Sequence, residues 1–348
     1  MLAISATNNT EFQTETIAGN PTNQDNLFTQ EINFTNPELS YNSIQIGCVC
    51  DGHGDHGHHV SKTVVVHSQD RINSVLTPES ALTEDQIKTF FEQLFVSIQS
   101  EVITMFEKMC ETKVQPDGIV YDKLGRPCRG GSSCVFAITI KYKNGRKKII
   151  TFHIGDSLAM VCNFKSQTRL LPSYKLLTEE HDCDSKVEYD RIMDSGLTHP
   201  FHFTYSNDPR LLVFDPITRK PNLAYKQYPV KYGIGRSSVR SLATYARTPY
   251  GCNPEYCIAM TRSFGNLGSE KYGMSRIPDM NEFELEDNES CDVFVASDGY
   301  FDAFQFEDLN NIITKFSTKS ERVEKLESEV KIQFGKFVDD RTFITWKV

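Results

Sequence analysis

The sequence lacks an excess of basic residues and has no long apolar run. It contains 37 Lys and Arg residues against 46 Asp and Glu residues in 348 positions, and its net charge at pH 7 is −9. Proteins that bind nucleic acid or anionic membranes usually present a net basic face. No stretch approaches the roughly 20 apolar residues of a membrane-spanning helix. We therefore expect neither nucleic acid nor a membrane as partner.

The sequence also lacks paired cysteine motifs and a secretory signal. Its 10 cysteines include no CxxC pair, and several lie in apolar, strand-like segments. Residues 1–20 contain no Lys or Arg and no apolar run of signal-peptide length. Free, buried thiols in a reducing compartment are expected, and a zinc site is disfavoured. We predict a cytoplasmic protein, with the nucleus as the alternative.

Apolar residues are frequent enough for a large core, at 39% of the chain. Thr83 and Gln86 predict a capping box that opens a long amphipathic helix. Gly155-Asp156-Ser157 predicts a bulge or bend within a strand. Strands are predicted at residues 41–51, 133–142, 148–162, 293–296 and 342–346, and helices at 83–109, 179–195, 307–316 and 321–334. This mixture in blocks predicts an α+β fold.

The predicted domain organisation is one domain with a loose tail. Residues 1–17 are polar and predict a flexible N-terminal tail, and residues 18–348 form the domain. Residues 196–256 have weak periodicity and predict a long surface insertion.

Five aspartates lie at the ends of predicted strands beside small or turn-forming residues. They are Asp25, Asp51, Asp156, Asp298 and Asp339. One such Asp commonly serves only as a turn former, but five with the same local pattern suggest a shared role. Converging carboxylates repel one another unless a cation lies between them, and ligation by oxygen alone selects Mg²⁺ or Mn²⁺ over zinc. The sequence therefore predicts a site for a hard divalent cation.

The segment 51–59 (DGHGDHGHH) contains four histidines. Its glycine spacing fits a tight loop rather than the helical HExxH zinc motif. We interpret Asp51 as a metal ligand and His53 as a nearby acid or hydrogen-bond donor. The other histidines, His56, His58 and His59, are expected at the surface or at the start of a helix.

Eight segments together resemble the metal-dependent Ser/Thr protein phosphatases of the 2C type (PPM family), in the family's order. They are NQD (23–25), DGHGDHGHHVSK (51–62), GSS (131–133), IGDS (154–157), LTEEHDCDSKVEYDRI (177–192), AMTRSFGN (259–266), ASDGYFD (296–302) and DDRT (339–342). DGHG or SDG alone would be weak, whereas the ordered set over residues 18–348 is specific. The resemblance implies a four-layer α-β-β-α sandwich, in which two mostly antiparallel sheets are flanked by helices. It also implies that residues 196–256 form a variable flap beside a metal-containing cleft.

The resemblance further implies a centre with two Mg²⁺ or Mn²⁺ ions. Asp51 would bridge the two ions, with the Gly52 carbonyl on one of them. Asp298 and Asp339 would complete the other. A metal-activated water would then attack phosphoserine or phosphothreonine in proteins, and His53 would protonate the leaving oxygen or orient that water.

Other residues are implied at the edge of this centre. Asp25 and Gln24 would hold metal-bound waters. Asp156 and Asp302 would support a third, weaker ion together with Asp298. Two ions, with a third as an option, are therefore expected as cofactors.

The sequence departs from the family's pattern at three positions. Asn20 stands where the family usually has a phosphate-binding Arg or Lys, Leu158 replaces an Arg, and Asn266 replaces an Asp. Loss of a charge-assisted contact weakens phosphate binding by ~1.5–3 kcal/mol if nothing replaces it. Arg126 and Arg129 are candidates for that replacement, although ordinary solvated arginines are the simpler interpretation.

Two hypotheses follow. The retained acids favour an active phosphoprotein phosphatase, and the three departures favour a pseudophosphatase that acts as a binding or scaffold module. A non-protein phosphate ester as substrate is a third, weaker possibility. The sequence does not name a substrate, and a monomer is the expected state.

Overall fold

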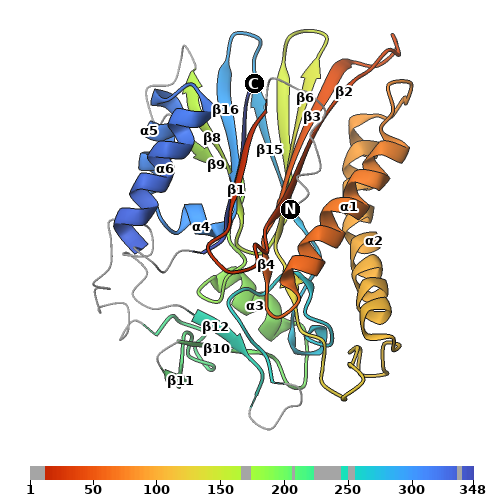
Figure 1. The fold of residues 1–348 in the computed structure, drawn as a ribbon, viewed down its shortest axis with the longest axis vertical. Coiled ribbons are helices and arrows are strands. Elements are labelled where there is room, and N and C mark those ends of the chain that lie inside the picture. Colours follow the sequence, from red (N-terminus) through yellow and green to blue (C-terminus); the bar gives the residue numbers. More distant parts are fainter. Residues whose placement is uncertain (1–11, 166–173, 206–207, 223–243, 250–254, 335–338) are drawn as a thin grey trace.

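Two five-stranded antiparallel sheets form the centre of the computed structural model (Figure 1). The structure describes residues 12–165, 174–205, 208–222, 244–249, 255–334 and 339–348. The first sheet has the order β15 (Asp279–Leu285), β7 (Lys147–Ile154), β6 (Cys134–Tyr142), β3 (Tyr41–Cys50), β2 (Asn26–Asn33). The second has the order β1 (Gln13–Ile17), β17 (Arg341–Lys347), β16 (Ser290–Ala296), β8 (Leu158–Lys165), β9 (Lys175–Leu176).

Helices cover the outer faces of both sheets (Figure 1). The first sheet is covered by α1 (Gly57–Val75) and α2 (Glu84–Cys110). The second is covered by α4 (Asp298–Phe301), α5 (Phe306–Lys315) and α6 (Lys319–Phe334). The predicted α+β fold with four α-β-β-α layers is thereby confirmed.

The two sheets pack directly on each other through an apolar core. Val49 and Val135 of the first sheet meet Val295 and Trp346 of the second. A Cβ atom on Gly47 would lie 2.7 Å from the Trp346 ring, so this close approach requires glycine. Burial of apolar side chains is the main favourable term in folding, and this layer joins strands from both ends of the chain.

The long helix α2 begins as predicted. Thr83 accepts a hydrogen bond from the Gln86 backbone, and the Gln86 side chain accepts one from the Thr83 backbone, which completes the capping box. Phe91 then stacks on Phe152 at a ring distance of 5.5 Å and meets Phe136 edge-on at 5.4 Å. No helix within the described ranges combines the length and the apolar character needed to cross a membrane.

The predicted strand at residues 148–162 is two strands in different sheets. Strand β7 ends at Ile154 and β8 begins at Leu158, so the chain crosses between the sheets at Gly155-Asp156-Ser157. Gly155 has a φ of 93°, and a Cβ atom there would lie 2.5 Å from the Ser133 side chain. Only glycine fits this crossing, and the crossing places Asp156 at the end of both sheets.

The N-terminal segment and α3 also differ from prediction. Residues 13–17, expected in the tail, form β1, which extends the edge of β17 from Gln13 opposite Thr345 to Ile17 opposite Arg341. The rest of the predicted tail, residues 1–11, lies outside the described residues. Helix α3 (Lys186–Asp194) is shorter than the predicted helix at residues 179–195, because Ser185 caps it by accepting from the Glu188 backbone.

Part of the predicted insertion at residues 196–256 has regular structure and a core of its own. Strands β10 (His202–Tyr205), β11 (Asp208–Leu212) and β12 (Thr244–Arg247) form a sheet with β13 (Cys257–Ile258). The aromatic side chains of Phe203 and Phe214 pack on Tyr189 of α3. Residues 206–207, 223–243 and 250–254 of the insertion lie outside the described residues. We refer to the sheet β11-β10-β12-β13 as the flap.

Among the described residues, most cysteines follow the prediction: seven are free and six of these are buried, among them Cys48, Cys50 and Cys134 in the core below α1 and α2. Cys257 is free but exposed, and Cys252 lies outside the described residues. The prediction of free thiols is wrong for Cys110, which forms a disulfide with Cys128. The intervening loop folds back on itself, with Cys128 donating its N–H to the Val120 carbonyl, and so brings together two cysteines that no sequence motif links.

Candidate metal centre and adjoining pocket

The predicted acids lie at chain segments that leave or enter the two sheets. Asp25 precedes β2, Asp51 follows β3, Asp156 joins β7 to β8, Asp298 begins α4, Asp302 follows α4, and Asp339 precedes β17. Figure 1 shows α4 and β4 (Gly52–His53) near the lower end of the sandwich. The antiparallel topology explains this gathering, because these segments connect at one end of the sheets.

Electrostatic coupling shows that Asp51 has acidic neighbours. Burial raises the pKa of Asp51 well above its ordinary value, and the charges of Asp25, Asp298 and Asp156 raise it further. Burial likewise raises the pKa of Asp25 to about 7, although a hydrogen bond from Ser297 opposes the shift. Like charges held together out of water disfavour the ionised form, and a bound cation would relieve this repulsion.

Asp298 extends this cluster to the remaining acids. Burial raises its pKa well above the ordinary value, and the charges of Asp156, Asp302 and Asp339 add to that effect. Each of the other acids proposed from the sequence thus lies near enough for its charge to act on Asp51 or on Asp298.

Two buried carboxylate oxygens show whether the site suits a cation. Oδ1 of Asp25 and Oδ1 of Asp298 are buried and have no hydrogen-bond partner within the described ranges. The other oxygen of Asp25 accepts a hydrogen bond of 2.8 Å from the Ser297 hydroxyl. A buried carboxylate oxygen without a donor is costly, and a divalent cation with oxygen ligands would satisfy it. The acids therefore fit a hard cation.

The Gly52 backbone is held tightly beside Asp51. A Cβ atom on Gly52 would lie 2.5 Å from the Gly57 carbonyl and 2.7 Å from the Gln24 carbonyl, so no other residue fits. Strand β4 pairs with β5 (Gly131–Ser132), and the Ser133 N–H donates to the Asp51 carbonyl over 2.9 Å. These contacts fix the main chain on both sides of Gly52.

His53 lies opposite Gly131 in the same small sheet and is bound by Asn266. The Asn266 amide donates to His53 Nε2 over 2.8 Å and to the Ser263 hydroxyl over 2.7 Å. Burial lowers the pKa of His53 to about 4, although the contact with Asn266 opposes the shift. A neutral ring that accepts at Nε2 carries its proton on Nδ1. Asn266, at first only a departure from a family pattern, thus determines the tautomer of His53.

Asp340 is a residue of the site that the sequence analysis did not single out. Its carboxylate accepts from the backbone N–H groups of Gly19, Asn20 and Gln24, at 2.7, 3.0 and 2.8 Å. The Asn20 side chain donates to Asp339 over 3.2 Å. Asp340 therefore fixes the backbone of the loop before Asp25. In the sequence, only its position directly after Asp339 could have pointed to this role.

Leu158, the third departure, and Arg126, a candidate for the missing cation, both lie away from the candidate centre's polar contacts. Leu158 is buried in the core beneath α4 and α5, so it makes no polar contact at the centre. Arg126 pairs with Asp122 four residues earlier, through Nη2 and Oδ2 at 2.8 Å. The side chain of Arg126 is thus occupied at the surface.

A pocket of about 420 Å³ adjoins His53. Its walls come from the site and from the flap. The lining residues are His53, Gly54, Asp55, Arg129, Gly130, Tyr245, Glu255, Tyr256, Cys257, Ile258, Ala259, Met260 and Asn266. The pocket therefore reaches the site at His53 and Asn266, and none of the six acids is among the residues that line it.

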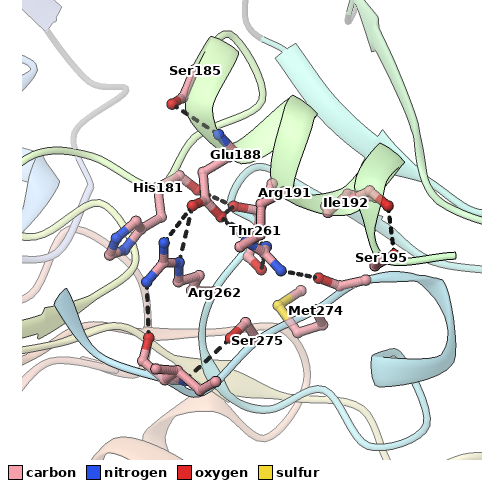
Figure 2. A network of polar contacts seen from close by, with 12 residues as sticks. His181, Ser185, Glu188, Arg191, Ile192, Ser195, Thr261, Arg262, Met274 and Ser275 are labelled. Atoms are coloured by element: carbon pink, nitrogen blue, oxygen red, sulfur yellow. Dashed lines mark hydrogen bonds and ion pairs between the residues drawn. The ribbon is translucent and has the colours of Figure 1, made fainter. Parts of the chain in front are cut away.

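A buried ion network supports the segment that carries Asn266 (Figure 2). Glu188 of α3 accepts from Arg262 at 2.6 and 3.1 Å and from the Thr261 hydroxyl at 2.6 Å. Arg191 donates to the same carboxylate at 2.8 and 3.0 Å. Burial alone would raise the pKa of Glu188, but the hydrogen bonds and charges of both arginines lower it to about 2. This network ties α3 to Thr261 and Arg262, five and four residues before Asn266.

Comparisons with known proteins agree with this architecture of a sandwich with acids at one end. A sequence model described as "Protein phosphatase 2C" matches residues 20–332. The chain therefore belongs to the protein phosphatase 2C family. A comparison with curated protein sequences gives no match.

Solved structures share the fold at low sequence identity. Serine-threonine phosphatase 2C from Toxoplasma gondii is 15% identical, with a TM-score of 0.59 over 98% of this chain and 96% of that one. Serine/threonine phosphatase Stp1 from Staphylococcus aureus is 16% identical, with a TM-score of 0.53 over 97% and 94%. A serine/threonine phosphatase from S. agalactiae is 14% identical, with a TM-score of 0.53 over 97% and 98%. The similarity thus extends over the whole fold.

Proposed function

We propose that this chain is a Mg²⁺- or Mn²⁺-dependent phosphatase that hydrolyses phosphoserine and phosphothreonine in proteins. The observation that carries the proposal is the group of mutually repelling acids, which includes buried oxygens of Asp25 and Asp298 without a hydrogen-bond partner among the described residues. Membership in the protein phosphatase 2C family supports the reaction class.

We assign two ions to the centre of this group. Asp51, the Gly52 carbonyl, Asp298 and Asp339 are the proposed ligands. When bound, such ions lower the pKa of water and neutralise charge on a phosphoryl group. The rigid β4–β5 pairing holds the Gly52 carbonyl, so this part of the site is organised before an ion binds.

The remaining acids are proposed to act around these ions. Asp25 would orient water, supported by its hydrogen bond from Ser297. Asp156 and Asp302 would hold a third ion with Asp298, since both raise the pKa of Asp298. A carboxylate that is repelled by neighbouring carboxylates is stabilised most by a bound cation.

His53 is proposed to act on the substrate. The Asn266 amide donates a hydrogen bond to His53 Nε2, so the neutral ring carries its proton on Nδ1. Nδ1 is buried and has no hydrogen-bond partner among the described residues, so we propose that the His53 ring, which lines the pocket, donates this proton toward the leaving Ser or Thr oxygen or toward the attacking water only after a shift that exposes Nδ1. No cysteine is needed in this scheme.

Phosphate release from a phosphothreonine peptide tests the proposal. We expect turnover with Mn²⁺, its loss with EDTA, and a loss of at least about 100-fold in Asp298→Asn. Asp308→Asn, on the first turn of α5, is the matched control and should keep wild-type turnover. Absence of metal-dependent turnover in the wild type would refute the proposed phosphatase activity. Calorimetric binding of Mn²⁺ without turnover would then favour the pseudophosphatase, the second candidate, which the departures at Asn20, Leu158 and Asn266 favour.

A further inference from the structure

The candidate centre lacks a cation at the position where Asn20 stands. The Asn20 side chain is directed to Asp339, and its backbone is bound by Asp340. A phosphoryl group carries two negative charges, and carboxylates surround the proposed ions. A cation that binds its outer oxygens would therefore have to come from elsewhere.

Arg129 is the one Lys or Arg among the described residues that line the pocket beside His53. Its backbone is well placed. The Arg129 carbonyl accepts from the His56 N–H over 3.0 Å, and Gly131, two residues later, lies opposite His53 in the β5–β4 pair. Two residues of extended chain span at most ~7 Å, so Arg129 projects from the immediate neighbourhood of His53.

The Arg129 side chain is also available. It is exposed and forms no ion pair with the residues that the structure describes. Asp55 and Glu255 line the same pocket without forming an ion pair to it. Arg126, three residues earlier, differs because Asp122 binds its guanidinium twice, at Nε and at Nη2. The two arginines before Gly130 thus have different environments.

We propose that Arg129 binds the phosphate of the phosphoserine or phosphothreonine substrate, and so replaces the cation missing at Asn20. This inference rests on the proposed function. The planar guanidinium can donate two parallel hydrogen bonds to phosphate oxygens. The phosphate then enters from the His53 side of the pocket, and the flap contacts the peptide that carries it.

The test compares Arg129→Ala with Arg126→Ala. We expect Arg129→Ala to raise KM for a phosphothreonine peptide and for a small phosphate ester by about tenfold each, with kcat within about twofold. The inhibition constant of inorganic phosphate should rise by a similar factor. Arg129→Lys should recover part of the loss, since it keeps the charge but not the paired donors. Arg126→Ala should match the wild type.

Several outcomes would overturn the inference. Unchanged KM and phosphate inhibition in Arg129→Ala would refute it while leaving the phosphatase intact. A change for the peptide alone would assign Arg129 to the peptide and not to the phosphate. If the wild type has no turnover, the proposed function fails, and calorimetric binding of inorganic phosphate with Mg²⁺ to wild type and Arg129→Ala still decides the role of Arg129.

Discussion

The protein buries acidic groups in two places and treats them in opposite ways. In the candidate metal centre, burial and neighbouring carboxylates raise the pKa of Asp51 and of Asp298. In the network between α3 and residues 261–266, Arg262 and Arg191 lower the pKa of Glu188 to about 2 (Figure 2). The second cluster contains its cations, whereas no Lys or Arg among the described residues forms an ion pair with Asp25, Asp51 or Asp298 of the first.

This difference separates a structural site from a binding site. The Glu188 carboxylate accepts five hydrogen bonds, from Thr261, Arg191 and Arg262. At the metal centre, by contrast, the buried Oδ1 atoms of Asp25 and Asp298 lack donors among the described residues. A buried carboxylate whose oxygens all have donors supports the fold by itself. One whose oxygens lack donors is stabilised when a cation binds to it.

The largest predicted effect comes from removing a cation from the Glu188 network, so that its carboxylate is left partly unpaired like those of the metal centre. Arg262→Ala leaves Glu188 buried with half of its cations, and we expect a loss of about 3–5 kcal/mol in the free energy of unfolding. Urea denaturation measures it. Arg219→Ala, which removes a half-exposed pair with Asp194, is the control and should cost under ~1 kcal/mol. Equal losses in the two variants would contradict the comparison.

The same cluster predicts an acid dependence of stability. The pKa of Glu188 in the folded protein is about 2, against 4.5 for an ordinary glutamate. A lowered carboxyl pKa stabilises the fold fully above the unfolded value, so this contribution should be lost as the pH falls from about 4.5 to about 2. At about 1.4 kcal/mol per pKa unit it amounts to ~3 kcal/mol.

Urea denaturation of wild type and Glu188→Gln across that pH range checks this expectation. The variant should be less stable near neutral pH and should show a flatter acid dependence. Identical slopes for the two proteins would show that Glu188 is not the group responsible.

A bound cation should stabilise the acids of the candidate metal centre, as the arginines stabilise Glu188. With Mg²⁺ or Mn²⁺ at about 100 times its dissociation constant, we expect unfolding to cost ~2.7 kcal/mol more than in EDTA. Thermal denaturation detects this as a higher Tm. Asp298→Asn should lose most of the increase, and its metal-free form should be at least as stable as the metal-free wild type because one repelling charge is gone. A metal-independent Tm would count against the site.

The smallest predicted effect concerns Asn20. Asn20→Arg places a cation beside Asp339, and we expect KM for a small phosphate ester to fall by about two- to fivefold. Asn144→Arg, in the turn between β6 and β7, adds the same charge at the other end of the strands and is the control. An unchanged KM in Asn20→Arg would show that a cation at position 20 adds nothing to the binding of phosphate.

Local sequence patterns predicted the parts of the protein that depend on near neighbours. The capping box of Thr83 and Gln86 follows from residues three positions apart, and the α2 stripe from helical spacing. The acids at strand ends were recognisable because each lies beside a turn-forming residue. The family motifs in order then implied the four-layer fold.

Patterns of this kind failed where distant segments decide the structure. Residues 13–17 form β1 because the edge of β17 is available to them, and their own sequence reads as a polar tail. Cys110 meets Cys128 only because the intervening loop returns. The flap has its core because α3 lies beneath it, which weak periodicity in residues 196–256 did not reveal.

The sequence by itself determined which groups are present: six acids, a histidine after DG, and no cation at Asn20. The tertiary structure decided how these groups act. Asn266 binds His53 across 213 positions, and Ser297 binds Asp25 across 272. It also separated Arg129, which faces the pocket, from Arg126, which is occupied by Asp122. Residue types and spacing follow from the chain alone, whereas burial, pairing and pKa depend on contacts that form only when remote segments pack together.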